Sequence, residues 1–539
     1  MTALSTSGGT GVGIALPACI RSGHRSGAVW LLAVGVAAAL LCLPFLQLVL
    51  FEEDGIWLNA AARLRGGQTL YRDFFQFLPP LSFLLTEAWL DLTGGSMVGA
   101  RVVFVMVTAG WACFTYLACL AATGRAPAAA ALALGSVVIT QGIWTQLNHH
   151  WFTMLFSMAL VWMTLSVASG IPSRSSAATP AEASAWRSLL AGLAGGAAAM
   201  VTPTRGALVL MASATVLLSR RRRPAEVFAF LGGAAALPGA MLAYLAMHGT
   251  LLDAFQSVIL FPLHQYSAIQ ALPYGTALTW QTISAALIYP GCAVALAALA
   301  VRDGRAIVHD RVLMACAAFA LAGLIGSYPR PDGAHLCFNM PLALPLAARG
   351  AMLLGSRWPA RIRRLAVAFP VCLMVVAMNV YGMVAFGTLQ IASEVTAAGP
   401  VRFADQAGRS AAVRRISALP AADQVFFYPY NPLMAVLAGR TQVSKYDLML
   451  PGYTLPAQYQ DACASVMREA GWVLLERRTM SKDQMRRSYP ALQDDMPPER
   501  LRFEHVLEQA FSPVARDGDY ELRRRTEAAE AGLCEGGWP

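Results

Sequence analysis

Charged side chains are scarce in this sequence. Only 13% of its 539 residues are Asp, Glu, Lys or Arg, while 56% are hydrophobic and the mean hydropathy is +0.50. At roughly 100–200 residues per domain the chain would form three or four soluble domains, and so little charge cannot cover their surfaces. Disordered, fibrous and disulfide-stapled proteins are also excluded, because they need more charge, a repeat or denser cysteine. The composition therefore predicts a polytopic α-helical membrane protein.

The few charges are distributed unevenly along the chain. Residues 1–389 hold 35 of the 72 charged side chains, and the last 150 residues hold the other 37. This indicates a long membrane part followed by a soluble tail. The membrane part has 23 basic and 12 acidic residues and the tail has 18 and 19, so the net charge of +10 comes from the membrane part. Such an excess reflects topology, and we expect no nucleic-acid partner.

Eleven apolar stretches are candidates to cross about 30 Å of hydrocarbon, which takes around 20 helical residues. They are 27–51, 97–121, 127–147, 150–170, 188–204, 206–219, 225–247, 276–301, 311–328, 337–355 and 365–389. The first is too long for the apolar core of a signal peptide, roughly 7–15 residues, so we expect 1–26 to be a cytoplasmic segment. Residues 74–93 are amphipathic and contain Pro79-Pro80, which predicts a segment that lies along or re-enters the membrane interface.

Basic residues divide strongly between the two sides of these spans. One side has 17 and the other has six. The 17 are Arg21, Arg25, Arg125, Arg174, Arg187, Arg220 to Arg223, Arg302, Arg305, Arg311, Arg349, Arg357, Arg361, Arg363 and Arg364. By the positive-inside rule this richer side is cytoplasmic. We therefore predict a bacterial cytoplasmic (inner) membrane protein with its N-terminus in the cytoplasm and its tail in the periplasm, and we expect the functional site on the outer face.

The tail, residues 390–539, has the pattern of a small α/β domain. Residues 424–429 and 472–477 have strand composition, 457–470 fits a helix between them, and 517–525 alternates like an edge strand. The tail contains no glycine-rich phosphate loop and no GxSxG, HExxH or CxxC motif, so it offers no catalytic motif of its own. Its two cysteines are Cys463 and Cys534, and the sequence alone favours free thiols over a disulfide between them.

Three consecutive acidic residues, Glu52, Glu53 and Asp54, stand at the outer end of the first span. Desolvation at such a position raises the pKa of a carboxyl group toward the range in which it accepts a proton from an alcohol. The alternative is a solvated acidic turn that caps the next helix, and the local sequence taken alone favours that alternative.

The residues after this triplet resemble a known family. An amphipathic helix is followed by G-x-x-x-Y-R-D-F-F at 67–75 and by Pro-Pro-Leu at 79–81. This order is similar to the first outer loop of GT-C class membrane glycosyltransferases, in particular the bacterial relatives of protein O-mannosyltransferases and of lipid A aminoarabinose transferases. The predicted topology agrees with that class over 27–389, and an external α/β tail is familiar in it.

The resemblance implies roles for several residues. It makes Asp54 the catalytic base, with Glu53 as the second candidate, and it places Tyr71 and Asp73 among the sugar or acceptor contacts. The class often has a lysine before the proline pair, where this chain has Leu78. The positive charge at the donor phosphate must then come from Arg72, Arg205 or Arg330.

Two further outer segments contain groups suited to phosphate. Arg205 lies in Thr-Pro-Thr-Arg-Gly between two short helices, where it would hold a phosphate through two parallel hydrogen bonds; the alternative is an arginine that reaches toward lipid headgroups. Residues 328–335 resemble an Arg-Pro-Asp-x-x-His element of these transferases. Arg330 and His335 would donate to phosphate oxygens and Asp332 would cap the next helix, and the alternative is a proline-stiffened turn.

The outer histidines allow several interpretations. Asn148-His149-His150 suggests a metal site, but adjacent histidines point in different directions and no outer cysteine or carboxylate is spaced near them. We therefore favour hydrogen bonds to sugar or acceptor over metal ligation, with an interfacial helix turn as the other interpretation. His264, in the loop 248–275, is a candidate sugar contact or a contact to lipid headgroups. We expect no cofactor, and the sequence leaves a divalent cation open.

These features predict a glycosyltransferase that moves a hexose or pentose from a polyprenyl-phosphate-linked donor to a hydroxyl of a glycan, lipid or protein acceptor. Asp54 would take the proton as the hydroxyl attacks the anomeric carbon opposite the lipid phosphate, whose charge the arginines would offset. One alternative is a transporter or flippase, for which we find neither ionisable residues near mid-span nor an inverted repeat. The other is an O-antigen ligase or polymerase, which would place its large loop between late helices.

Overall fold

The computed structural model describes residues 23–50, 52–141, 144–169, 180–219, 223–279, 282–356, 358–404, 408–492, 496–527, 531–535 and 538. Several arginines of the predicted cytoplasmic side lie outside the described residues, as does most of the predicted segment 1–26. These arginines are Arg21, Arg174, Arg220, Arg221, Arg222 and Arg357.

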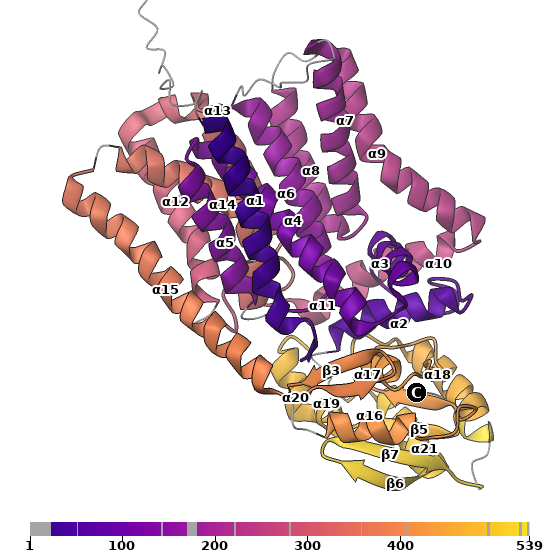
Figure 1. The fold of residues 1–539 in the computed structure, drawn as a ribbon. Coiled ribbons are helices and arrows are strands. Elements are labelled where there is room, and N and C mark those ends of the chain that lie inside the picture. The colour runs from indigo at the N-terminus through magenta and orange to yellow at the C-terminus, as the bar shows by residue number, and fades with distance from the viewer. Residues whose placement is uncertain are drawn as a thin grey trace, which may run out of the picture.

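The membrane part is a helical bundle (Figure 1). Among the described residues, each predicted span overlaps one helix, but the first helix is shorter than predicted: it ends at Cys42, and residues 43–49 form a short 3-10 helix and a two-residue strand. The helices are α1 (Gly23–Cys42), α4 (Met97–Thr123), α5 (Ala126–Gln141), α6 (His149–Ala168), α7 (Pro180–Ala199), α8 (Pro203–Leu218), α9 (Pro224–Met247), α12 (Ile283–Asp303), α13 (Arg311–Ile325), α14 (Gly333–Gly355) and α15 (Ala360–Gln390). Seven of the described helices are long and apolar enough to cross a membrane, while α5, α8 and α13 are shorter apolar helices. The chain is thus a multi-pass membrane protein, and its number of spans stays a prediction.

Burial separates the inner helices of the bundle from the outer ones. In α6 and α14, 67% of the most apolar stretch is buried against protein, whereas the value is 11% in α9 and 17% in α15. An apolar helix with so little protein contact needs lipid around it. Figure 1 agrees, since α15 runs along the outside of the bundle before it enters the C-terminal part.

Contacts between loops identify the two ends of the bundle. At one end Arg349, near the end of α14, pairs with Asp310 (2.7 Å) and donates to the backbone oxygen of Ala122 (3.0 Å). At the other end Arg330, just before α14, donates to the side chain of Gln270. The loops of the two predicted sides therefore gather at opposite ends, and the C-terminal part packs on the predicted outer end (Figure 1). Which side of a membrane each end faces stays a prediction.

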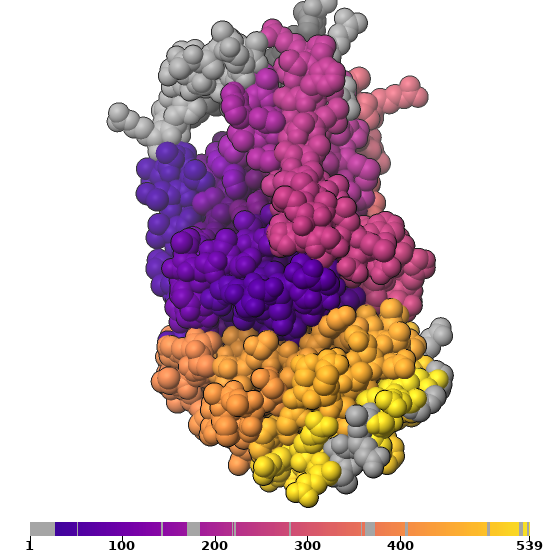
Figure 2. Space-filling view, turned by 90° about the vertical axis from the view of Figure 1, so that its right-hand side faces the viewer, coloured from indigo at the N-terminus to yellow at the C-terminus, as the bar shows by residue number. Residues whose placement is uncertain are grey.

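Short elements form a layer between the bundle and the C-terminal part. They are η2 (Leu43–Phe45), β1 (Leu48–Val49), α2 (Glu53–Arg65), α3 (Leu81–Thr93), α10 (Leu251–Phe255), η3 (Gln256–Leu260), η4 (Pro262–Tyr266) and α11 (Ser267–Gln270), while η5 (Gly304–His309) lies at the opposite end. Of the predicted amphipathic segment 74–93, only α3 is helical, since Pro79 and Pro80 precede it. In the space-filling view the C-terminal part forms one lobe directly beneath this layer (Figure 2).

The C-terminal part contains two sheets. In the first, β1 pairs in parallel with β3 (Gly399–Phe403), which also pairs with β2 (Glu394–Thr396), so the segment that follows α1 and the tail share a sheet. The second has the order β4-β5-β7-β6, with β4 (Val425–Tyr428), β5 (Trp472–Glu476), β6 (Phe511–Asp517) and β7 (Tyr520–Arg525). The surrounding helices are α16 (Arg409–Ser417), α17 (Pro432–Leu437), α18 (Pro456–Glu469), α19 (Arg477–Met480), α20 (Lys482–Ser488), α21 (Pro498–Ala510) and η6 (Ala531–Cys534).

Two predictions for the tail are wrong. The segment 517–525 contains β7, which is not an edge strand, because β6 forms a hairpin with it and takes the edge. Cys463 and Cys534 form a disulfide, with their Cα atoms 5.9 Å apart, because η6 folds back onto α18. By contrast, the strands predicted at 424–429 and 472–477 correspond to β4 and β5, and the helix predicted between them is α18.

Candidate functional site

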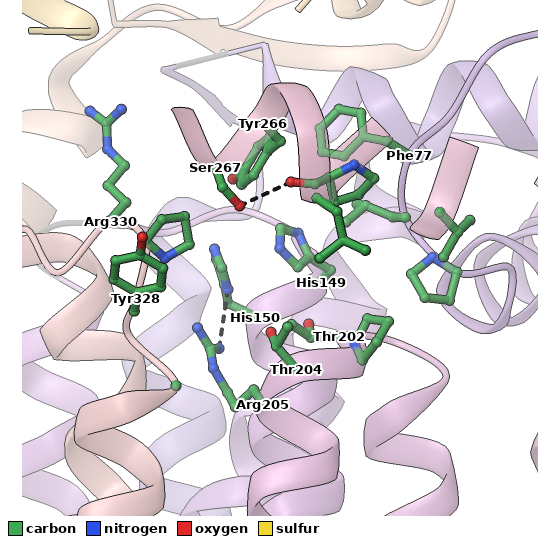
Figure 3. A pocket seen from close by; sticks show the side chains of 18 of the residues that line it. Phe77, His149, His150, Thr202, Thr204, Arg205, Tyr266, Ser267, Tyr328 and Arg330 are labelled. Carbon is green, nitrogen blue, oxygen red and sulfur yellow. Dashed lines mark hydrogen bonds between the residues drawn. The ribbon is translucent and has the colours of Figure 1, made fainter. Parts of the chain in front are cut away.

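A cavity of about 260 Å³ opens at the outer end of the bundle (Figure 3). Its walls come from the starts of α6 and α8, from the loop before α14, from η3 and η4, and from the segment before α3. One wall is apolar and includes Val258, Ile259 and Leu263. The polar end is lined by His149, His150, Arg205, Arg330 and His335. Such a combination suits an amphiphile with a charged head and a hydrocarbon tail.

Arg205 stands in the first turn of α8 and is 2% exposed. The helices around Arg205 pack closely. A Cβ atom added to Gly206 would lie 2.2 Å from the backbone of Ala199, and a Cβ atom added to Gly326 would lie 3.2 Å from the Cγ atom of Arg205. Its Nη1 atom lies 3.1 Å from Nδ1 of His150, and its Nε atom has no partner. No described carboxylate lies within ion-pair distance of this guanidinium. A buried charge is costly unless an opposite charge compensates it, so this site is suited to an anion.

Three histidine rings surround that guanidinium. His149 and His150 have ring centroids 3.9 Å apart, and His150 lies 5.0 Å from His335 in an edge-to-face arrangement. Because Arg205 donates to Nδ1 of His150, the second nitrogen of that ring carries the proton. The three rings therefore gather polar nitrogens near the arginine at the polar end of the cavity, and His150 contacts it directly.

Asp332 orients the third histidine, His335. Its Oδ1 atom accepts from the backbone nitrogen of His335 (3.0 Å) and lies 2.8 Å from Nδ1 of the same residue. Burial raises the pKa of Asp332, but the hydrogen bonds and charge of His335, together with Arg330, hold this pKa well below its usual value. The carboxylate is therefore ionised, it caps α14 as predicted, and it fixes the orientation of the imidazole.

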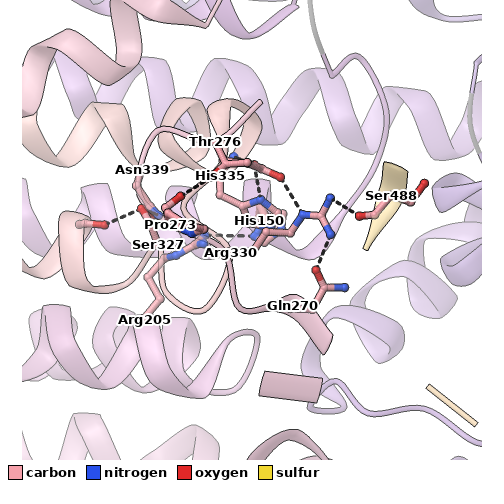
Figure 4. Close-up of polar contacts among 12 residues, drawn as sticks. His150, Arg205, Gln270, Pro273, Thr276, Ser327, Arg330, His335, Asn339 and Ser488 are labelled. Carbon is pink, nitrogen blue, oxygen red and sulfur yellow. Dashed lines mark hydrogen bonds and ion pairs between the residues drawn. The ribbon is translucent and has the colours of Figure 1, made fainter. Parts of the chain in front are cut away.

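Arg330 connects the cavity to the C-terminal part. Its guanidinium donates to Asp332 (2.7 Å), to the side chain of Gln270 (2.6 Å) and to the backbone oxygen of Ser488 in α20 (2.9 Å), as Figure 4 shows. It also lies over the ring of Tyr489, 5.5 Å from the centroid. Since these partners already hold three sides of the guanidinium, Arg330 is less available to a phosphate than Arg205.

The three acidic residues of the first outer loop make different contacts. Glu52 accepts from the backbone nitrogen of Leu433 in α17 (2.9 Å), so it binds the C-terminal part. Glu53 accepts from the side chain of Gln146 (2.9 Å). Asp54 is fully buried and pairs with Arg101 of α4. Three adjacent acidic side chains therefore contact three different parts of the chain.

Glu53 has the features of a general base. Burial raises its pKa to about 7; hydrogen bonds from its own backbone and from Gln146 oppose this rise, and the adjacent carboxylates add to it. One helical turn later in α2, Trp57 stacks on His149 with ring centroids 6.0 Å apart. Because His149 lines the cavity, this contact packs α2 against the cavity wall. A carboxyl group with such a pKa exchanges protons near neutral pH.

Asp54 is placed differently from its predicted role. Besides the pair with Arg101, it accepts from the backbone nitrogen of Leu147 (2.9 Å). An arginine and a backbone amide occupy its two oxygens, and no part of the side chain is exposed. Burial raises the pKa of Asp54, and Arg101 and the backbone of Leu147 oppose this rise. These two partners leave the carboxylate no route to an acceptor. Asp54 therefore joins α2 to the bundle, and Glu53 is the better candidate for the base.

Other predicted site residues lie outside the cavity. Tyr71 donates to the backbone oxygen of Leu78 (2.7 Å), and Asp73 accepts from the side chain of Arg72 (3.1 Å) and from the backbone nitrogen of Thr69 (2.7 Å), so the three residues at 71–73 form a local turn. Asn148 caps α6 by accepting from the backbone nitrogen of Trp151 (3.2 Å). His264 is exposed and lies 2.9 Å from the backbone oxygen of Leu260. None of these five side chains lines the cavity.

Sequence reasoning missed several residues that shape this site. Arg101 is one of the six basic residues on the predicted outer side, and an arginine within an apolar helix is itself a signal of a buried partner. Gln146 and Tyr266 carry no signal of this kind, because only the fold brings them to Glu53 and to the cavity. Among the described residues, no group of three His, Cys, Asp or Glu is arranged to hold a metal ion.

The fold resembles those of solved membrane enzymes. The chain's sequence matches no protein-family model and no curated protein. The structure of ArnT from Cupriavidus metallidurans bound to undecaprenyl phosphate has a TM-score of 0.51 and 13% identity, over 94% of this chain and 99% of that chain. The Archaeoglobus fulgidus oligosaccharyltransferase tethered with an acceptor peptide has a TM-score of 0.50 and 10% identity, over 92% and 74%. Both are GT-C glycosyltransferases, so the chain has the GT-C fold, as the first outer loop predicted.

Proposed function

We propose that this protein is a membrane glycosyltransferase that takes a sugar from a polyprenyl-phosphate-linked donor and transfers it to an acceptor hydroxyl at the periplasmic face. The observation that carries the proposal is Arg205, a buried cation without a carboxylate partner among the described residues, at the polar end of a cavity with an apolar wall. A lipid phosphate supplies both the missing negative charge and a tail for that wall. The complex of ArnT with undecaprenyl phosphate adds support through the shared fold.

The reaction is a displacement at the anomeric carbon. The acceptor oxygen bonds to this carbon while its bond to the phosphate oxygen breaks, and the lipid phosphate leaves with the electron pair. Glu53 takes the acceptor proton, a role that its pKa of about 7 suits. Attack from the face opposite the phosphate inverts the anomeric configuration.

The positive end of the cavity stabilises the leaving phosphate. Arg205 offsets the charge that develops on the phosphate oxygen, and His335, held by Asp332, lines the same end of the cavity. Arg330 adds charge from the cavity rim and keeps the loop before α14 in place. Contacts within the protein hold these groups in place, so little reorganisation is needed when the donor binds.

Binding of undecaprenyl phosphate to purified protein tests the anion site. We expect Arg205→Ala and Arg205→Lys both to weaken binding by tenfold or more, because a lysine cannot reproduce the planar two-pronged contact of an arginine. The matched control is Arg402→Lys, an arginine that donates to backbone oxygens of Leu389 and Ile391 away from the cavity. Wild-type affinity in both Arg205 variants would contradict the proposed role of this residue.

A further inference from the structure

The last helix of the membrane part, α15, has one face that no other described element covers. The opposite face packs on the protein through Val380, Ala385 and Thr388, each of which is at most 8% exposed. The exposed residues recur every three or four positions, so they share one side of the helix. They include Cys372, Val375, Val376, Asn379, Met383, Phe386 and Gln390.

Asn379 stands at the centre of this exposed face and close to the midpoint of the predicted span 365–389. The helix ends at Gln390, so about 16 Å of helix, at 1.5 Å per residue, separates Asn379 from its outer end. The hydrocarbon layer of a membrane is about 30 Å thick. The carboxamide of Asn379 is therefore expected near the middle of the membrane, on a surface that otherwise faces lipid chains.

The hydrogen bonds of Asn379 are incomplete within one copy of the chain. Its Nδ2 atom donates to the backbone oxygen of Val375 (2.7 Å), the carbonyl one helical turn earlier. A carboxamide has two N–H groups and an acceptor oxygen, so one N–H and the oxygen have no partner among the described residues. Lipid chains supply none, and an unsatisfied polar group in hydrocarbon is costly. Asparagines at this depth typically bond across helices, which points to a helix from outside this chain.

A second copy of the chain supplies a matching group. All copies enter the membrane in the same orientation, so a two-fold axis along the membrane normal brings the same residue of each copy to the same depth. A carboxamide both donates and accepts, so two Asn379 side chains can bond to each other reciprocally. Gly382 lies about one turn further along the exposed face, and a Cβ there would meet no atom of the chain within 4 Å. Small residues of this kind let two membrane helices approach closely.

We propose that this protein forms a two-fold symmetric dimer through α15, in which the Asn379 side chains of the two copies bond to each other near the middle of the membrane. In Figure 1, α15 runs along the outside of the bundle. None of the residues that line the cavity belongs to α15, so the interface leaves the cavity untouched. The dimer is therefore independent of the function proposed above.

Energy transfer between labelled copies in liposomes tests this inference. Purified full-length protein is labelled at its N-terminus with either of two fluorophores and measured at rising ratios of protein to lipid. We expect wild-type protein to dimerise, and Asn379→Leu to weaken dimerisation by about 3- to 30-fold, the worth of one interhelical hydrogen bond in a membrane. Asn379→Gln keeps the carboxamide and should retain most of the affinity. Tyr381→Phe is the matched control, because it removes a polar group from the packed face, where the phenol donates to Leu41 (2.9 Å).

Cys372 provides a second and independent test in native membranes. It is exposed and lies on the same face as Asn379, about two helical turns away. Treatment with copper phenanthroline in air oxidises two thiols that meet to a disulfide. We expect it to link two copies of the chain through Cys372, and Cys372→Ser should abolish that product on a non-reducing gel.

A wild-type melting temperature in Asn379→Leu would show that the variant folds, since leucine suits a surface that faces lipid. Energy transfer in the wild type no greater than that of randomly distributed copies would overturn the dimer. Wild-type dimerisation in Asn379→Leu would overturn the role of the carboxamide. Oxidation that links Cys372 to a different protein, and to no second copy, would overturn the dimer in favour of another membrane partner.

Discussion

At the scale of single residues, Glu53 sets the expected pH dependence. Its folded pKa of about 7 means that the carboxylate needed as a base is the minor form below pH 7 and the major form above it. The transfer rate should therefore rise about tenfold per pH unit between pH 5 and 6.5 and level off above pH 7.5. Rates measured at saturating donor across this range check the prediction. A wild-type rate that is flat or falls as the pH rises would exclude Glu53 as the base.

Asp54 and Arg101 should behave as a structural pair. Removing one member of a buried ion pair leaves an uncompensated charge and typically costs about 3–5 kcal/mol. We therefore expect Asp54→Asn and Arg101→Met each to lower the melting temperature strongly. The double variant should be less destabilised than the sum of the two single changes, because neither charge is then left alone. Thermal unfolding of the purified variants gives the comparison, and additive losses would mean that the two side chains are not coupled.

The first outer loop shows how far the contacts and role of a residue can be predicted from the sequence. The acidic triplet and its position after the first span are evident in the sequence, and its catalytic role stays a prediction. The contacts of the three carboxylates depend on Leu433, Gln146 and Arg101, which are distant in sequence and are brought to the triplet only by the fold. Arg205 could be identified because its Thr-Pro-Thr-Arg-Gly setting breaks the helical pattern at an outer loop.

At the scale of elements, Gly55 controls how α2 packs on α17. A Cβ at this position would lie 2.1 Å from the backbone nitrogen of Leu433, which is the same group that Glu52 binds. Alanine favours a helix over glycine by roughly 0.5–1 kcal/mol, so Gly55→Ala would stabilise an isolated α2. In the folded protein we expect the opposite, a loss of about 1–3 kcal/mol from overpacking, together with reduced transfer.

The control for that variant is Gly232→Ala in α9. A Cβ there meets no atom within 4 Å, so neither the melting temperature nor the activity should fall. Equal melting temperatures for Gly55→Ala and wild type would show that α17 does not press on α2 as described.

Helices and strands are predictable from the sequence where apolar runs are long. They are less predictable where the position of a strand depends on which strand pairs with it. The run at 97–121 yields α4, and the run at 337–355 yields most of α14, because burial in lipid or protein requires such lengths. The position of β7 inside its sheet depends on β6, a neighbour whose exposed residues give no strong strand pattern. Likewise, the turn at 71–73 matches the family motif yet lies outside the cavity, since it is closed by its own hydrogen bonds.

At the scale of the whole molecule, the two ends of the bundle should face different compartments. The 17-to-6 division of basic residues predicts that the C-terminal part is outside the cytoplasm. A phosphatase reporter fused after residue 390 should be active in cells, and one fused after residue 223 should be inactive. The disulfide between Cys463 and Cys534 should then be oxidised in cells, which thiol labelling of the denatured protein detects. Reversed reporter signals would move the proposed site to the cytoplasmic face.

Our central claim is that the cavity of the membrane part holds a lipid phosphate and that Glu53 activates the acceptor. Transfer of labelled sugar from a panel of polyprenyl-phosphate-linked sugars to glycan acceptors by the purified protein tests it most directly. We predict turnover with at least one donor, and a loss of about 10²–10⁴-fold in Glu53→Gln with unchanged binding of undecaprenyl phosphate. No transfer from any donor by the wild-type protein, or wild-type turnover in Glu53→Gln, would contradict the account.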